Sequence, residues 1–140
     1  MTVLTDSLLS IVVPLYNEEE NVALLTKKIH ESLIGYTYQI IYIDDFSTDA
    51  TRKVVKGMDD DKVHLIALKK NYGQSLALAA GIDYAKGEYI ITMDGDLQND
   101  PSDIPEMLSY AVSGEYDVIT GIRQKRKDSL IKKIPSKIAN

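Results

Sequence analysis

Residues 8–15 read LLSIVVPL, a nearly continuous apolar run close to the start of a 140-residue chain. A run of this length, without alternation between polar and apolar residues, is typical of a strand that is buried on both faces. Such strands occur in parallel sheets that carry helices on both sides. The segment therefore predicts one strand of an α/β sheet.

Beyond this strand, short apolar runs alternate along the chain with segments of helical spacing. Apolar residues recur at helical spacing over 18–34, and Gly35 follows as a helix stop. The other expected helices are 47–58, 75–86 and 101–114, and the other expected strands are 38–44, 62–68, 88–94 and 116–121. This order predicts an α/β fold: an open, mostly parallel, Rossmann-like sheet flanked by helices, with right-handed crossovers.

Composition and charge exclude several classes of protein. The chain has no cysteine, which excludes disulfides, thiolate metal sites and cysteine nucleophiles. Residues 121–140 carry seven Lys or Arg and one Asp, a net charge of +6, so the total of −5 leaves −11 for the first 120 residues. Contacts to phosphates dominate nucleic-acid affinity, so we expect no nucleic-acid partner for this acidic body. No stretch has the pattern of a signal peptide or a membrane span.

Polar residues follow three of the expected strands, in the segments PLYNEEE (14–20), DDFSTD (44–49) and DGDLQND (94–100). Ligands of open α/β sheets bind beyond the carboxyl ends of the strands. We therefore expect the three acid-bearing ends at one edge of the sheet, where they can line one pocket.

The first two polar segments also have an ordinary structural interpretation. Asn17 and Glu20 are spaced as a helix-capping pair, and Ser47 or Thr48 suits the start of a helix.

The third segment belongs to the stretch YIITMDGDLQNDP, residues 89–101. In an extended chain Asp94, Asp96 and Gln98 would project to the same side, with Gly95 permitting a bend. Hard oxygen ligands in this arrangement suit Mg²⁺ or Mn²⁺. The alternative interpretation is a solvated acidic turn. The chain has no P-loop, dinucleotide fingerprint or GxSxG elbow.

Four segments together resemble a known family. They are IVVPLYNEEENV (11–22), IYIDDFSTDAT (41–51), LKKNYGQSLALAAGIDYAKGEYIITMDGDLQNDP (68–101) and YDVITGIRQKRKDS (116–129). In order and spacing they resemble family 2 glycosyltransferases of the GT-A fold. NYGQ and DGDLQNDP resemble the polyprenyl-phosphate sugar transferase branch, which includes dolichol-phosphate mannose synthase, bactoprenol glucosyltransferase and undecaprenyl-phosphate aminoarabinose transferase.

The resemblance implies a nucleotide-sugar-binding role for six residues. Three match the first nucleotide-contacting motif, one matches the acid that contacts the base, and two lie in a loop beside the nucleotide. In that order they are Pro14, Tyr16 and Glu18, then Asp45, then Gly73 and Gln74.

The resemblance also implies a metal site and an acceptor site. Asp94, Asp96 and Gln98 match the metal-binding DxDxQ motif, with Mg²⁺ or Mn²⁺ as the cofactor. Arg123 falls where relatives place an arginine near the acceptor phosphate, and Arg126 is a weaker candidate for the same task.

The implied activity is transfer of a sugar, with inversion, from a UDP or GDP donor to a lipid-phosphate acceptor, most simply polyprenyl phosphate. A phosphate monoester has a second pKa near 6, so it needs no strong general base, and none is assigned. The implied location is a cytoplasmic domain of a protein at the cytoplasmic face of the inner membrane.

The expected organisation is a GT-A nucleotide-sugar-binding domain over 1–121. Residues 122–140 are expected to begin the acceptor or membrane-proximal region as a basic amphipathic segment, with a solvated tail as the alternative. Since relatives usually continue further, the chain is expected to be the nucleotide-sugar half of a longer enzyme.

Three alternatives to this function remain. One is a donor-binding fragment that is inactive alone, and another is a family 2 transferase with a soluble or polysaccharide acceptor. The remotest is a Mg²⁺-binding receiver-like signalling domain. A receiver needs its acidic pair after the first strand, whereas Asp44 and Asp45 follow the second.

Overall fold

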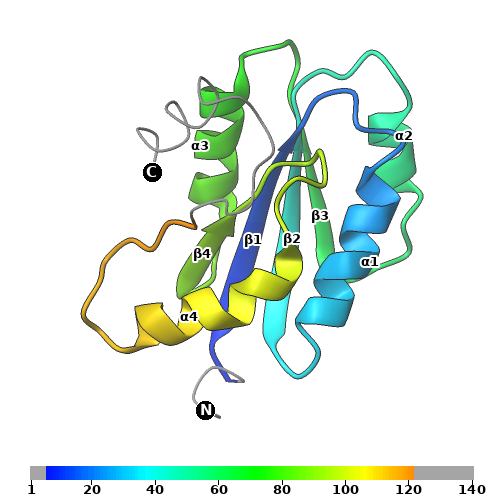
Figure 1. Cartoon of the computed structure of the whole chain (residues 1–140). Helices are drawn as coiled ribbons and strands as arrows, with labels where there is room; N and C mark the ends of the chain where they lie inside the picture. The colour runs from blue at the N-terminus through cyan, green and yellow to red at the C-terminus, as the bar shows by residue number, and fades with distance from the viewer. Residues whose placement is uncertain (1–5, 122–140) are drawn as a thin grey trace, which may run out of the picture. The chain divides into compact units, whose positions relative to one another are not determined.

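The computed structural model describes residues 6–121 (Figure 1). These residues belong to two compact units with a boundary between Ser102 and Asp103. The first unit contains β1 (Leu8–Leu15), α1 (Val22–Ser32), β2 (Thr37–Asp44), α2 (Thr51–Lys56), β3 (Val63–Ala67), α3 (Gln74–Tyr84) and β4 (Tyr89–Thr92). The 3-10 helix η2 (Pro101–Asp103) lies at the boundary, and α4 (Ile104–Val112) belongs to the second unit. No helix among the described residues is long and apolar enough to cross a membrane.

The strands described form one parallel sheet in the order β3-β2-β1-β4. β1 pairs with β2 along its whole length and with β4 over Leu9–Val12. This strand order is that of a doubly wound sheet. Strands are added on one side of β1 up to β3, and β4 is then added on the other side of β1. Receiver domains place β3 beside β1 instead. The receiver alternative is therefore wrong.

Helix α3 covers one face of the sheet. Val12 of β1 and Ile41 and Ile43 of β2 lie on this face, where they form a fully buried cluster with Ala77 of α3. Gly81, one turn further along α3, allows the helix to lie directly against the sheet.

The opposite face of the sheet packs against α1. The hydroxyl of Tyr42, which points away from α3, lies 2.6 Å from the hydroxyl of Thr26 in α1. Burial, opposed by this hydrogen bond and reinforced by the charge of Asp60, raises the pKa of Tyr42 to about 12. The phenol therefore stays neutral at physiological pH. Since both faces are covered, the prediction of a doubly buried strand at 8–15 is confirmed.

The fifth strand expected at 116–121 is wrong, because the structure places these residues in irregular backbone. The side chains of Tyr116 and Val118 are 53% and 76% exposed. Apolar alternation favours a strand only where one face of that strand becomes buried. These side chains gain no such burial.

Gly81 offers a test of the close packing between α3 and the sheet. A Cβ at Gly81 would lie 2.5 Å from both Ile43 Cδ1 and Val12 Cγ1. We expect Gly81→Val to lower the free energy of unfolding by about 1–3 kcal/mol through overpacking, measured by chemical denaturation. Gly57→Val is the matched control, since a Cβ there meets Lys53 O at 3.4 Å. We expect it to change stability by less than about 0.5 kcal/mol. Equal effects of the two variants would contradict the packing argument.

Candidate functional site

The three polar loops predicted to share an edge lie at the carboxyl edge of the sheet. They are residues 16–21 after β1, 45–50 after β2 and 93–100 after β4. Because β1 pairs in parallel with both β2 and β4, the three loops emerge next to one another. The strand order switches sides between β1 and β4, and doubly wound sheets bind their ligands at this switch point.

Asn17 joins the first loop to the second. Its Oδ1 accepts the backbone N–H groups of Thr48 and Asp49 at 2.8 and 3.2 Å, and its own N–H donates to Ser47 Oγ at 2.9 Å. The helix-capping roles expected for Asn17, Ser47 and Thr48 are therefore wrong. These polar groups bind the opposite loop instead of their own helix ends.

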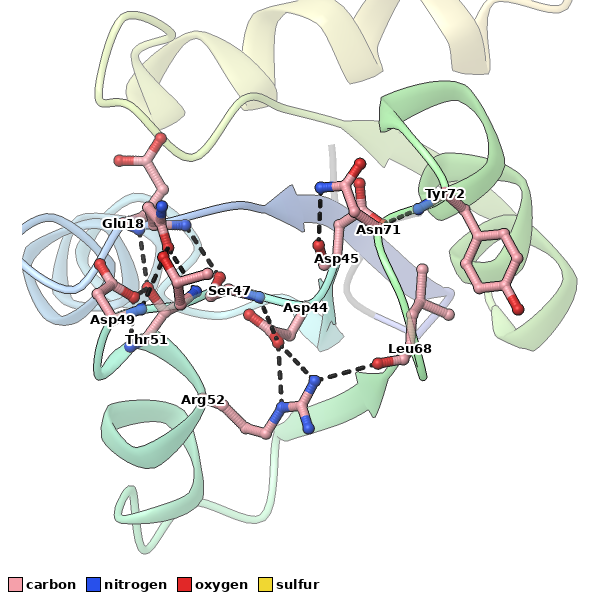
Figure 2. A network of polar contacts seen from close by, with 12 residues as sticks. Glu18, Asp44, Asp45, Ser47, Asp49, Thr51, Arg52, Leu68, Asn71 and Tyr72 are labelled. Atoms are coloured by element: carbon pink, nitrogen blue, oxygen red, sulfur yellow. Dashed lines mark hydrogen bonds and ion pairs between the residues drawn. The ribbon is translucent and has the colours of Figure 1, made fainter.

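A second row of contacts links the same two loops (Figure 2). Glu18 N–H donates to Thr51 Oγ1 at 2.8 Å, and Ala50 N–H donates to a carboxylate oxygen of Glu19 at 2.7 Å. Asp49 accepts from the N–H groups of Glu19 and Thr51. Slight burial opposes ionisation of Asp49, but the hydrogen bonds from Thr51 and Glu19 outweigh it and lower the pKa of this carboxyl.

This cross-linking explains where the helices start. α1 begins at Val22 and α2 at Thr51, four residues later than the sequence predicts in each case. Neither helix has a side-chain hydrogen bond at its N-cap. The residues that resemble capping signals are used to fasten two loops to each other.

Asp45 holds the loop that follows β3 (Figure 2). Its carboxylate, in a residue that is only 4% exposed, accepts the backbone N–H groups of Tyr72 and Gly73 at 2.8 and 3.0 Å. Its carbonyl oxygen accepts from Asn71 Nδ2 at 3.1 Å. Gly73 has φ +97°, a conformation that glycine adopts at little cost. The structure thus brings Asp45 and Gly73 into direct contact.

Gln74 continues this chain of contacts to the acidic loop after β4. It is the first residue of α3, and its Nε2 donates to Asp94 Oδ1 at 3.1 Å. Asp94 N–H in turn donates to Asn99 Oδ1 at 2.8 Å, across the loop. Asp45, Gly73, Gln74 and Asp94 therefore lie in one hydrogen-bonded series.

The acidic loop is not extended, so the predicted alternation over Asp94, Asp96 and Gln98 is wrong. β4 ends at Thr92, and Leu97 has φ +67°. Gln98 N–H donates to Asp96 Oδ1 at 3.1 Å, which closes a tight turn. The turn, not a pleated strand, determines where these side chains lie.

Gly95 brings this acidic turn against the first loop. A Cβ at this position would lie 2.6 Å from Leu15 Cδ2 and 3.4 Å from Glu18 Cγ. Only a residue without a side chain fits so close to the end of β1. Asp94 and Asp96 are therefore held next to Glu18.

A divalent cation fits the donor set of this turn. Asp94 is partly exposed and Asp96 and Gln98 are exposed, so their oxygen atoms can meet a hydrated ion. Within residues 6–121, no group of three or more acidic or histidine side chains is arranged to hold a metal alone. Mg²⁺ in particular commonly uses one or two protein carboxylates and completes its shell with water and phosphate oxygens. The turn suits that mode of binding.

Each of the three loops contains one non-glycine residue with positive φ. These residues are Asn17, Phe46 and Leu97, with φ of 55°, 62° and 67°. Backbone strain of this kind concentrates at functional sites. Sequence reasoning missed it, because asparagine is the only one of the three that commonly marks this conformation.

The remaining predicted site residues are distributed as follows. Pro14 lies in β1 opposite Ile43, and Tyr16 follows the strand with 48% of its surface exposed. Arg123 and Arg126 lie outside the described residues.

The fold and its loops define a doubly wound α/β domain whose polar loops gather at the switch point, where folds of this class bind their ligands. Comparison with known proteins gives the family. Glycosyl transferase family 2 matches residues 10–138, and the chain belongs to that family.

Two relatives extend this comparison. The chain is 46% identical over 139 residues to a dodecaprenyl-phosphate galacturonate synthase of Rhizobium johnstonii. It is 41% identical over 136 residues to an undecaprenyl-phosphate 4-deoxy-4-formamido-L-arabinose transferase of Pectobacterium carotovorum. Each match covers 94% of this chain and 41% of the relative, so the chain spans about two fifths of these proteins. The resemblance to the polyprenyl-phosphate branch is confirmed.

A solved structure supports the fold. A mannosyltransferase from Pyrobaculum calidifontis, in complex with GDP-Man and Mn²⁺, matches with a TM-score of 0.60 and 24% identity. The match covers 81% of this chain and 33% of the mannosyltransferase. The expected GT-A fold is confirmed.

The role of Asp45 in holding the loop after β3 leads to a stability prediction. Asp45→Asn leaves one acceptor oxygen, and its new NH₂ group faces the N–H of Tyr72 or Gly73. We expect the free energy of unfolding to fall by about 1–3 kcal/mol, since a partly buried backbone donor loses its partner. Asp83→Asn, at an exposed position on α3, is the control and is expected to have little effect. Denaturant titration of both variants measures the difference, and an unchanged midpoint for Asp45→Asn would refute it.

Proposed function

We propose that this chain is the nucleotide-sugar-binding part of a metal-dependent glycosyltransferase that transfers a sugar to polyprenyl phosphate. The observation that carries this proposal is the hydrogen-bonded series from Asp45 through Gly73 and Gln74 to Asp94, at the switch point of the sheet. A series of this kind can contact a ligand with a base at one end and a diphosphate at the other. The names of the two relatives support a polyprenyl-phosphate acceptor.

The nucleoside end of the donor, UDP or GDP, is assigned to Asp45. Each carboxylate oxygen of Asp45 accepts one backbone N–H and keeps a further lone pair, so it can accept an N–H from a nucleobase. Phe46 and Tyr72, 46% and 44% exposed, adjoin Asp45 and offer aromatic faces to a base. Pro14, Tyr16 and Glu18 are assigned to the same nucleotide from the loop after β1.

The diphosphate end is assigned to the acidic turn. Asp94, Asp96 and Gln98 would hold Mg²⁺ or Mn²⁺, which would neutralise the charge that develops on the departing diphosphate. The Mn²⁺ that accompanies GDP-Man in the Pyrobaculum mannosyltransferase supports this assignment. Gln74 fixes the orientation of the Asp94 carboxylate through its amide hydrogen bond.

The acceptor end is assigned to Arg123, with Arg126 as a second candidate. An arginine fork matches the oxygens of a phosphate. The ionised phosphate is itself the nucleophile, so no strong base is required. In this proposal the domain of residues 1–121 binds the nucleotide sugar. The segment of residues 122–140 begins the acceptor and membrane-proximal region, at the cytoplasmic face of the inner membrane. A fragment that binds the donor without turnover, and a soluble or polysaccharide acceptor, are the competing outcomes.

Donor binding is tested by thermal stabilisation. At a nucleoside diphosphate concentration of about 100 times Kd, binding would stabilise the fold by about 2.7 kcal/mol. We expect UDP or GDP to raise the Tm only when Mn²⁺ or Mg²⁺ is present, and we expect Asp96→Ala to abolish this rise. Asp59→Ala, which removes an exposed carboxylate from the loop before β3, controls for net charge and should respond like the unaltered chain. No rise in Tm with any nucleotide would sink the proposal.

The acceptor is tested by supplying the phosphate nucleophile or withholding it. The chain, extended by the segment that its relatives possess, is incubated with Mn²⁺ and a radiolabelled nucleotide sugar. We expect label to pass to undecaprenyl phosphate and not to undecaprenol, because the alcohol lacks the ionised oxygen. Arg123→Met is expected to reduce transfer to the phosphate at least tenfold. Transfer to a soluble sugar with none to the lipid phosphate would show that the acceptor assignment is wrong.

A further inference from the structure

We propose that Arg52, through its ion pair with the buried Asp44, is a positioning residue that holds the loop after β3 in the form required for nucleotide binding. Its importance for binding rests on the proposed function. Its effect on the loop does not, and can be measured without a ligand.

The ion pair is built around a fully buried carboxylate. Asp44, the last residue of β2, has no exposed surface, and its Oδ2 accepts from Arg52 Nε and Nη2 at 3.0 and 2.8 Å. Ser47 N–H donates to the same oxygen at 3.2 Å. Oδ1 of Asp44 accepts no hydrogen bond from the described residues. Arg52 therefore supplies the counter-charge that a buried carboxylate requires.

The same guanidinium also reaches the end of the neighbouring strand (Figure 2). Arg52 Nη2 donates to the carbonyl oxygen of Leu68 at 3.1 Å, and Leu68 N–H donates to the carbonyl oxygen of Asp44 at 3.0 Å. Leu68 is the first residue after β3. Arg52 thus ties the end of β2 to the point where the next loop begins.

The far end of that loop is held by Asp45, the first residue after β2. The carboxylate of Asp45 accepts hydrogen bonds from the backbone N–H groups of Tyr72 and Gly73. Only residues 69–71 lie between the anchor at Leu68 and the anchor at Tyr72. A loop this short, fixed at both ends, has few conformations available. Loss of the Arg52 hydrogen bond to Leu68 would allow the loop more conformations. Nucleotide binding would then have to restrict the loop again, at a cost in conformational entropy.

The geometry requires arginine and not merely a positive charge. One planar fork contacts the Asp44 carboxylate and the Leu68 carbonyl together, which a single ammonium group cannot reproduce in the same way. Lys53, the next residue of α2, is exposed and forms no ion pair among the described residues. It provides a charge-matched control on the same helix.

The test compares Arg52→Met with Lys53→Met, using the nucleotide-free chain first. Hydrogen exchange is measured at the backbone amides of Tyr72 and Gly73, at a temperature where each variant is fully folded. We expect exchange at these two amides to become at least tenfold faster in Arg52→Met and to stay unchanged in Lys53→Met. Unchanged exchange in Arg52→Met would overturn the proposal.

The second readout is the Kd for UDP or GDP with Mn²⁺, by calorimetry, set beside the Tm without ligand. We expect Arg52→Met to weaken binding on the order of tenfold, equivalent to about 1.4 kcal/mol, while Lys53→Met changes Kd by less than about twofold. A lower Tm with an unchanged Kd would show a purely structural role and would refute the inference.

Arg52→Lys covers the case in which Arg52→Met does not fold. It keeps the charge beside Asp44, so we expect the chain to fold, with exchange and Kd between those of the unaltered chain and the methionine variant. Wild-type exchange and Kd in Arg52→Lys would overturn the need for the fork. If the unaltered chain binds no nucleotide, the proposed function fails, and amide exchange alone decides the role of Arg52.

Discussion

The parallel pairing of β1 with β2 on one side and β4 on the other is the constraint on which the rest of the structure depends. An apolar run such as LLSIVVPL must be covered on both faces, and parallel neighbours can be joined only by crossovers that cover them. Parallel pairing also places every strand's carboxyl end at one edge. Parallel pairing of the strands therefore accounts both for the burial of the core and for the gathering of the polar loops at one edge.

Where the hydrogen bonds between strands end, the backbone N–H groups of the loops need other hydrogen-bond acceptors. Side chains from a different loop provide them in this fold. Asn17 accepts from the loop after β2, Asp45 from the loop after β3, and Glu19 from Ala50. Each loop therefore depends on a neighbouring loop for the hydrogen-bond partners of its backbone. That mutual dependence is the physical basis for assigning positioning roles at this edge.

The sequence predicts the layout of the sheet and the gathering of the acidic loops, because apolar runs and parallel topology are sufficient for both. It does not predict the contacts within the edge. Asn17 and Ser47 have the residue types of helix caps, and only the three-dimensional neighbourhood shows that they bind across loops. Leu97 gives no sign of its positive φ, so an extended run of ligands looks plausible where a turn exists. The segment 116–121 has strand-like alternation but lacks the burial that would make a strand.

The acids at this edge are compensated in different ways, and the difference points to their tasks. Asp44 is buried and receives a guanidinium, while Asp45 receives two backbone N–H groups. Asp96 is exposed and accepts the N–H of Gln98 from its own turn, and it forms no ion pair with the basic side chains described. A carboxylate already neutralised within the fold suits a structural or positioning task. A carboxylate at the surface whose charge no basic side chain among the described residues offsets, and which lies beside other carboxylates, favours the approach of a cation. The amino-acid composition does not distinguish these acids. Their hydrogen-bond and ion-pair partners in the structure do.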